Sequence, residues 1–171
     1  QASRADSVQR VVVATDSQEI IDAVESHGFE AVMTSAEHTN GTSRLGEACK
    51  ILQLANDEMV INVQGDEPEI EPRVIDAAEH AALFTEEIGV GTVVAPISSD
   101  EEFRDPNVVK AVLGDGINTP SIPVCNAMYF SRSPIPYPRN APAESAHRHV
   151  GIYAYTVASI QAYLDLAPGN L

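Results

Sequence analysis

Short apolar runs alternate with amphipathic stretches along the first hundred residues. The runs at residues 11–14, 30–34, 60–64 and 91–96 are typical of buried strands. Between them, apolar side chains recur at three- and four-residue spacing, as they do on one face of a helix. The resulting βαβαβαβ order implies mostly parallel strands joined by right-handed crossovers. We therefore expect a layered α/β sandwich.

Turn and cap residues place the ends of these helices. Asp16 and Glu19 match a capping box ahead of the first helix, and Gly28 suits the position after its last turn. Pro72 suits the first turn of the helix that leads to the fourth strand. These signals agree with the hydrophobic pattern.

The second half of the chain has a different pattern. Residues 108–113 and 127–131 resemble strands, and a long segment with Gly, Asn and Pro separates them. This predicts an antiparallel ribbon with an extended connection, and it makes the sheet mixed. The proline-rich stretch 133–142 predicts an irregular loop, followed by a strand at 150–155 and a helix at 158–166.

Composition is that of one ordinary globular domain. The 171 residues are 44% hydrophobic and 20% charged, so we expect a single domain over residues 1–171. No run of eighteen apolar residues and no basic start before an apolar stretch occurs, which predicts a cytoplasmic protein with no membrane partner. Cys49 and Cys125 stand far apart and are expected to be reduced, buried thiols.

Charge excludes one class of partner. The formal net charge is −15, and Lys50 and Lys110 are the only lysines. Such a chain is unsuited to the phosphate backbone of DNA or RNA, so no nucleic acid partner is expected. An anionic nucleotide would depend on a few arginines, backbone amides and a bound cation.

The segment VINVQGDEP at residues 60–68 carries the strongest chemical signal. Its apolar run breaks abruptly at Gly65, Asp66 and Glu67, and the carboxyl end of a strand is where ligands bind in open α/β sheets. A carboxylate there suits Mg²⁺, which sits on one or two carboxylates plus substrate phosphates. Gly65 permits close approach of a ligand. The alternative is that both acids only cap the turn before Pro68.

Residues 40–44 form a second candidate contact surface for a nucleotide. The Asn-Gly turn leads into a helix, so Thr42, Ser43 and Arg44 would offer hydroxyls, amides and a guanidinium at a positive helix end. Ordinary turn and cap chemistry explains the same residues.

The last predicted strand has a polar-aromatic face. Alternation places His149, Gly151, Tyr153 and Tyr155 on one face and puts core residues on the other. His149 and Tyr153 would lie about 13 Å apart, close enough to line one sugar-sized pocket but too far to share a metal.

Arg132 follows the predicted strand 127–131. Its planar fork suits bidentate capture of a carboxylate, although it could equally be a surface arginine paired with one of the many acids.

Six segments in this order carry a resemblance to a known family. They are VVVATD at 11–16, NGTSR at 40–44, VINVQGDEP at 60–68, DPNVVKAVL at 105–113, AMYFSRSPIPY at 127–137 and HRHVGIYAY at 147–155. Together they resemble the 3-deoxy-manno-octulosonate cytidylyltransferase (CMP-Kdo synthetase) family. Each piece alone is weak, but the ordered combination is highly specific.

The resemblance implies an activity and a fold. The family joins CTP and the sugar acid Kdo to give CMP-Kdo and pyrophosphate for lipopolysaccharide biosynthesis, uses Mg²⁺ and is usually a homodimer. The implied fold is a Rossmann-like three-layer sandwich with a mixed, mainly parallel sheet, of the nucleotide-diphospho-sugar transferase type. The implied chemistry is in-line attack of the anomeric hydroxyl on the α-phosphate of CTP.

The resemblance also implies roles for single residues. Asp66 would be the catalytic Mg²⁺ ligand. The cytidine nucleotide would lie near Thr42, Ser43, Arg44, Gln64 and Gly65, and the Kdo site would be lined by Arg132, His149 and Tyr153.

Two family segments have no counterpart in these 171 residues. One is the first strand with a loop of the type PARxxSxRxPxKxL, and the other is a later acidic segment of the type GxDTPxDL. We therefore expect a domain incomplete at both ends, with half a metal site and weak or no activity. The alternatives are a cytidylyltransferase for another acidic sugar, such as 8-amino-Kdo or an acylneuraminate, and a non-catalytic truncated binding remnant.

Overall fold

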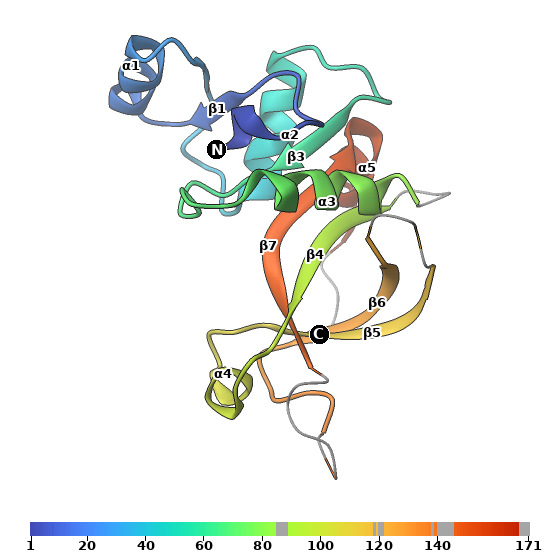
Figure 1. Ribbon diagram of the computed structural model, residues 1–171. Helices are drawn as coiled ribbons and strands as arrows, with labels where there is room; N and C mark the ends of the chain where they lie inside the picture. The colour runs from blue at the N-terminus through green and yellow to red at the C-terminus, as the bar shows by residue number, and fades with distance from the viewer. Residues whose placement is uncertain (85–88, 118, 120–121, 138, 140–145, 168–171) are drawn as a thin grey trace. The chain divides into compact units, whose positions relative to one another are not determined.

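The structure is a computed structural model that describes residues 1–84, 89–117, 119, 122–137, 139 and 146–167 (Figure 1). The chain divides into two units, of which unit 1 comprises Gln1–Gly91 with Ile152–Leu171, and unit 2 comprises Thr92–Gly151. The expected single domain over residues 1–171 stays a prediction.

The order of elements follows the predicted alternation in the first half. The elements are η1 (Ala2–Arg4), β1 (Val12–Thr15), α1 (Gln18–Ser26), β2 (Glu30–Met33), α2 (Gly41–Ile51), β3 (Met59–Asn62), α3 (Pro72–Ala82), β4 (Val90–Pro96), α4 (Asp100–Arg104), β5 (Lys110–Ile117), β6 (Val124–Ser131), β7 (His147–Thr156) and α5 (Val157–Leu164). The α/β class is confirmed. Among the described elements, α4 was not predicted.

Strands β1 and β2 form a parallel pair across α1, running from Val12 opposite Glu30 to Thr15 opposite Met33. The predicted capping box of α1 is wrong, because the N-cap is Ser17 and Asp16 lies one residue too early. Gly28 adopts a φ of +78° just after the helix, which confirms its predicted role, since glycine takes this left-handed conformation without strain.

The other five strands form a separate sheet with the order β3-β7-β5-β6, and β4 pairs with β7. The β3–β7, β5–β7 and β5–β6 pairs are all antiparallel. The expectation of one mixed, mainly parallel sheet is therefore wrong. The strand–helix alternation predicted the elements correctly, but β3 pairs with β7 from the far end of the chain instead of with β1 or β2. The three-layer arrangement stays a prediction.

The β5–β6 ribbon confirms the predicted antiparallel pairing of the second half, from Lys110 opposite Ser131 to Ile117 opposite Val124. Both strands are longer than predicted, so the connection between them is shorter. Glycine makes this extension possible, because a Cβ at Gly116 would lie 2.5 Å from Cys125 Sγ. Residues 133–137 are irregular, as expected of the proline-rich loop, while residues 138 and 140–142 of that prediction lie outside the described residues.

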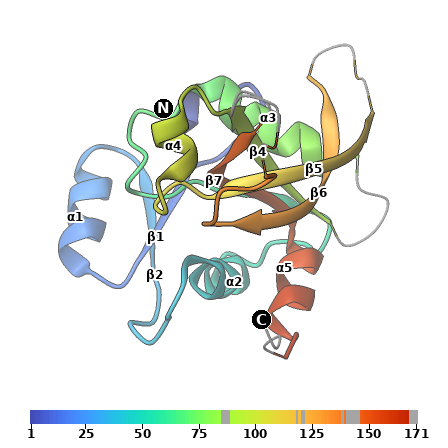
Figure 2. The same cartoon turned by 90° about the horizontal axis from the view of Figure 1, so that it is seen from below.

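Each unit has its own packed core. In unit 1, α2, α5 and the end of β7 enclose a cluster of Cys49, Tyr155, Val157 and Ile160. Figure 2 shows α2 beside α5, and a Cβ at Gly46 would lie 2.4 Å from Leu164 Cδ1, so glycine permits this close packing. In unit 2 the core cluster is Ile97, Phe103 and Ala146.

Cys49 is buried and Cys125 is exposed, and both are free thiols. The prediction of two buried thiols is wrong for Cys125, because it lies on β6 at the edge of the sheet. None of the described helices is long and apolar enough to cross a membrane.

Candidate functional site

Arg44 joins the ends of β1 and β2 to helix α2. Its Nη1 donates to Thr34 Oγ1 at 2.7 Å, and its Nη2 lies 3.1 Å from Asp16 Oδ2. Thr34 is buried, and the hydrogen bond from Arg44 lowers the pKa of Asp16. The guanidinium is thus paired with a carboxylate that sequence analysis had assigned to a helix cap.

The loop before α2 is held by several short-range contacts. Asn40 caps the helix by accepting from Ser43 N at 2.9 Å, and Ser43 Oγ donates back to Asn40 O at 2.9 Å. His38 Nδ1 lies 3.0 Å from Ser43 Oγ, and its Nε2 pairs with Glu47. Glu47 also accepts from Ser35 N at 2.8 Å. Cap chemistry therefore accounts for Asn40 and Ser43, and it orders the first turn of α2.

Tyr155 connects this helix end to β3. Burial raises the pKa of its phenol, and the side chains of Thr42 and Asn62 oppose this rise. A Cβ at Gly41 would lie 3.7 Å from Asn62 Nδ2, so the helix end lies against the end of β3. Asn62 and Tyr155 were not predicted from the sequence as members of this group. The signals that could have found them are the polar end of the β3 run and the aromatic alternation in β7.

The turn after β3 carries the predicted metal ligand. Glu67 N donates to Gln64 O at 3.2 Å, and Gln64, Gly65 and Asp66 are all exposed. Within the described residues, the Asp66 carboxylate makes no capping hydrogen bond. The alternative interpretation required such a bond. Its exposure is compatible with a bound ligand.

The chemistry of the donor set decides how well Mg²⁺ would fit. The described parts of the chain contain no group of three or more His, Cys, Asp or Glu side chains that could hold a metal ion. A single carboxylate such as Asp66 suits Mg²⁺ only where phosphate oxygens or water complete the octahedron. The residues present therefore fit a cation that arrives with its nucleotide.

Unit 2 holds two of the predicted sugar-acid contacts. Arg132 Nη1 donates to the backbone carbonyl of Pro106 at 2.8 Å. His149 Nε2 lies 2.9 Å from Thr92 Oγ1, and its ring packs on Phe130 with a centroid distance of 4.8 Å. Burial lowers the pKa of His149, which favours the neutral imidazole. Thr92 and Phe130 were not singled out from the sequence.

Tyr153 belongs to unit 1. Its ring stacks on Tyr155 with a centroid distance of 6.0 Å, which confirms that these side chains share a face of β7. Burial raises the pKa of its phenol. That Tyr153 lines the same pocket as His149 stays a prediction, because the two residues belong to different units.

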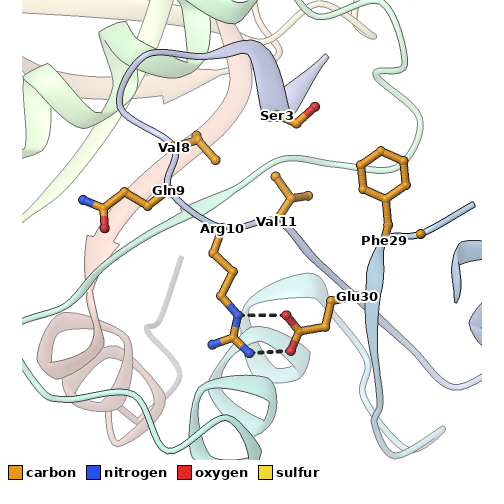
Figure 3. A pocket seen from close by; sticks show the side chains of 8 residues that line it. Ser3, Val8, Gln9, Arg10, Val11, Phe29 and Glu30 are labelled. Atoms are coloured by element: carbon orange, nitrogen blue, oxygen red, sulfur yellow. Dashed lines mark hydrogen bonds and ion pairs between the residues drawn. The ribbon is translucent and has the colours of Figure 1, made fainter.

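One open groove of about 270 Å³ lies elsewhere in unit 1 (Figure 3). Its lining includes Val8, Val11 and Phe29, together with a bidentate ion pair between Arg10 and Glu30. None of the predicted site residues contributes to it.

Comparisons with known proteins give the family. A family model described as cytidylyltransferase matches residues 1–168. The chain belongs to the cytidylyltransferase family. This confirms the resemblance drawn from the six sequence segments.

The relatives of this chain share one name. The 3-deoxy-manno-octulosonate cytidylyltransferase of Syntrophobacter fumaroxidans is 38% identical over 172 residues, which cover 99% of this chain and 66% of that protein. Its namesake from Neisseria gonorrhoeae (strain NCCP11945) is 43% identical over 171 residues, which cover 95% and 64%. The chain thus spans a little under two thirds of the length of these relatives.

A solved structure agrees with the sequence relatives. The structure of CMP:2-keto-3-deoxy-manno-octonic acid synthetase complexed with CTP matches this chain with a TM-score of 0.81 and 38% identity. The match covers 99% of this chain and 65% of that one.

Proposed function

We propose that this chain forms part of an enzyme that activates Kdo with CTP, releasing pyrophosphate and CMP-Kdo. The observation that carries the proposal is the similarity over nearly the whole chain to relatives named for this activity and to a structure complexed with CTP. The arrangement of α2, the end of β3 and Tyr155 in unit 1 gives it a physical basis.

The nucleotide would bind at the N-terminal end of α2. Backbone amides at a helix start attract phosphate, and His38, Asn40 and Glu47 hold this start in place before any ligand arrives. We assign nucleotide contacts to Thr42, Ser43, Arg44, Gln64 and Gly65. Since Asp16 already neutralises Arg44, that guanidinium orders the site more than it contributes charge.

We assign a Mg²⁺ ion to Asp66, acting together with the nucleotide's phosphate oxygens. Bound there, Mg²⁺ would neutralise negative charge on the leaving pyrophosphate. The contribution of the chain itself is an exposed carboxylate next to a glycine that a ligand can approach closely.

The sugar acid would be held by Arg132, His149 and Tyr153. With Nη1 on Pro106, the Nε and Nη2 edge of Arg132 is the one that a carboxylate could engage in two parallel hydrogen bonds. A neutral His149 can hydrogen-bond a sugar hydroxyl without adding charge. Catalysis would come mainly from placing the anomeric hydroxyl in line with the α-phosphate, since such displacements need little covalent help from the protein.

We further propose a homodimer that works in the cytoplasm and supplies lipopolysaccharide biosynthesis. Edge strand β6 supports the dimer, since its Met128 and Tyr129 are 70% and 56% exposed and Phe130 is also exposed. A second copy is a natural cover for such an edge. Sedimentation of wild type and Met128→Asp would test this, and an unchanged monomer in both would contradict it.

Pyrophosphate release tests the function. It would be measured with CTP, Mg²⁺ and Kdo, on this chain and on a version extended at both ends with flanking segments of the Syntrophobacter relative. Release from the extended form that depends on Kdo supports the proposal, and Asp66→Asn should abolish it. Release with 8-amino-Kdo or an acylneuraminate instead would reassign the sugar, and CTP binding without turnover would indicate a binding remnant.

A further inference from the structure

Lys110 is a fully buried cation near the predicted sugar-acid site. It lies at the start of β5 with 0% of its surface exposed. Lysine is almost never buried in this way unless its ammonium group is paired or hydrogen-bonded. Here Nζ donates to two backbone carbonyls, Asp105 O at 2.9 Å and Val108 O at 2.6 Å.

Both carbonyls belong to one tight turn, residues 105–108, which we call the DPNV turn. Val108 N donates to Asp105 O at 3.2 Å. Asp105 Oδ1 accepts from Asn107 N at 2.8 Å and from Asn107 Nδ2 at 3.0 Å. The turn therefore has internal bonds on its exposed side and the Lys110 ammonium on its buried side.

The remaining carbonyl of interest, Pro106 O, accepts from Arg132 Nη1 at 2.8 Å. Arg132 follows Ser131, which lies directly opposite Lys110 in the β5–β6 pair. Two cations thus hold the same turn, Lys110 from the buried side and Arg132 from the exposed side. Without the ammonium, two carbonyls would lose their buried donor, and the turn that carries Pro106 O would have to rearrange.

We propose that Lys110 is a positioning residue for sugar-acid recognition: it fixes the DPNV turn, whose Pro106 carbonyl orients the Arg132 guanidinium toward the carboxylate of the substrate. The inference rests on the proposed function through the role of Arg132. Lys110 itself touches no substrate. Its removal should therefore weaken sugar-acid binding and leave the nucleotide unaffected.

A double-mutant cycle in the full-length protein tests this. Lys110→Met, Arg132→Met and the double variant would be compared by the KM for Kdo and the KM for CTP, both from pyrophosphate release. We expect Lys110→Met to raise the KM for Kdo about tenfold and to change the KM for CTP less than about twofold. The double variant should be no worse than Arg132→Met alone, because both act through one guanidinium. Equal changes in both KM values, or effects that multiply, would overturn the proposal.

Arg104→Met is the matched control. Arg104 is an exposed cation of the same unit, ion-paired with Asp100 at 2.7 Å on α4. Its removal should leave both KM values within about twofold of wild type. If Lys110→Met does not fold, Asn107→Ala loosens the same turn from its exposed side and should show the same selective loss of Kdo affinity. Asn107→Ala with unchanged KM for Kdo would then overturn the proposal.

A direct readout separates this inference from the proposed function. The NMR signal of Arg132 Nε–H should shift and broaden in Lys110→Met but not in Arg104→Met. If the wild type releases no pyrophosphate with any sugar acid, the proposed function fails, and the NMR comparison still decides whether Lys110 orients Arg132. An unchanged Arg132 signal in Lys110→Met would refute the positioning role in either case.

Discussion

The start of α2 and the β5–β6 ribbon hold their basic side chains in different ways. At the start of α2 in unit 1, Arg44 is paired with Asp16 and His38 with Glu47. Around β5 and β6 in unit 2, Lys110 and Arg132 are held by backbone carbonyls.

The difference has an electrostatic consequence. A carboxylate cancels the charge of its partner, so Arg44 acts mainly by tying the ends of β1 and β2 to α2. A carbonyl only orients a cation, so the charge of Arg132 remains available to an anion. In a chain with a net charge of −15, we infer that Arg132, which pairs with no carboxylate of the described residues, marks where a sugar acid would bind.

The largest expected effect comes from removing that charge. Arg132→Met should lower kcat/KM for Kdo about a hundredfold, since a charge-assisted pair with a carboxylate contributes about 1.5–3 kcal/mol. Arg132→Lys keeps the charge but loses the planar guanidinium with its paired donors, and it should recover only part of the activity. Steady-state kinetics with Kdo varied at saturating CTP would measure both. A small effect of Arg132→Met would remove the distinction between the start of α2 and the β5–β6 ribbon.

Arg44→Met should act on stability instead of on Kdo. It leaves buried Thr34 without its donor and Asp16 without its counter-ion, and the free energy of unfolding should fall by about 1–3 kcal/mol. Urea unfolding would measure this. The control is Arg10→Met, which removes the exposed Arg10–Glu30 pair and should change the free energy of unfolding by close to zero. A loss of Kdo affinity comparable with that of Arg132→Met would contradict the comparison.

Tyr155→Phe should have a smaller effect, confined to unit 1. Removing the hydroxyl takes away its polar interactions with Thr42 and Asn62, at a cost of about 0.5–1.5 kcal/mol in unfolding free energy. Because Thr42 lies in the first turn of α2, the KM for CTP should rise while the KM for Kdo stays the same. Tyr163→Phe, at an exposed tyrosine of α5, is the control.

The smallest effect is a pH dependence from His149. Burial lowers its pKa in the folded protein, so the unfolded chain binds the proton more readily. The stabilising contribution of the neutral ring is therefore complete above the ordinary pKa of about 6.5 and is lost as pH falls toward the folded value. Unfolding free energies of wild type and His149→Gln between pH 8 and 5 would test this. A wild type that loses no more stability than the variant would contradict it.

Much of the first half was predictable because it depends on local pattern. The strands near residues 11–14 and 60–64 follow from apolar runs, and Gly28 ends a helix through its own backbone freedom. The family also followed from short ordered segments, and the matching family model confirms it. Each of these features can be recognised from residues that lie close together in the chain.

The hydrogen-bond partners of individual side chains were not predictable in the same way. The spacing of Asp16 predicts a capping box, yet its carboxylate accepts a hydrogen bond from the guanidinium of Arg44, 28 residues away. A lysine within DPNVVK gives no sign that it is fully buried under a turn formed by the residues just before it. Both outcomes depend on which groups the folded chain brings within hydrogen-bond distance.

The sequence by itself determined the α/β class, the places of nearly all the elements and the family. The tertiary structure decided that β3 pairs with β7, that most strand pairs are antiparallel, and that Asn62 and Tyr155 join the start of α2. The physical reason is the range of the interactions. Hydrophobic periodicity and turn chemistry act over a few residues, whereas strand pairing and buried polar contacts are selected by the packing of the whole chain.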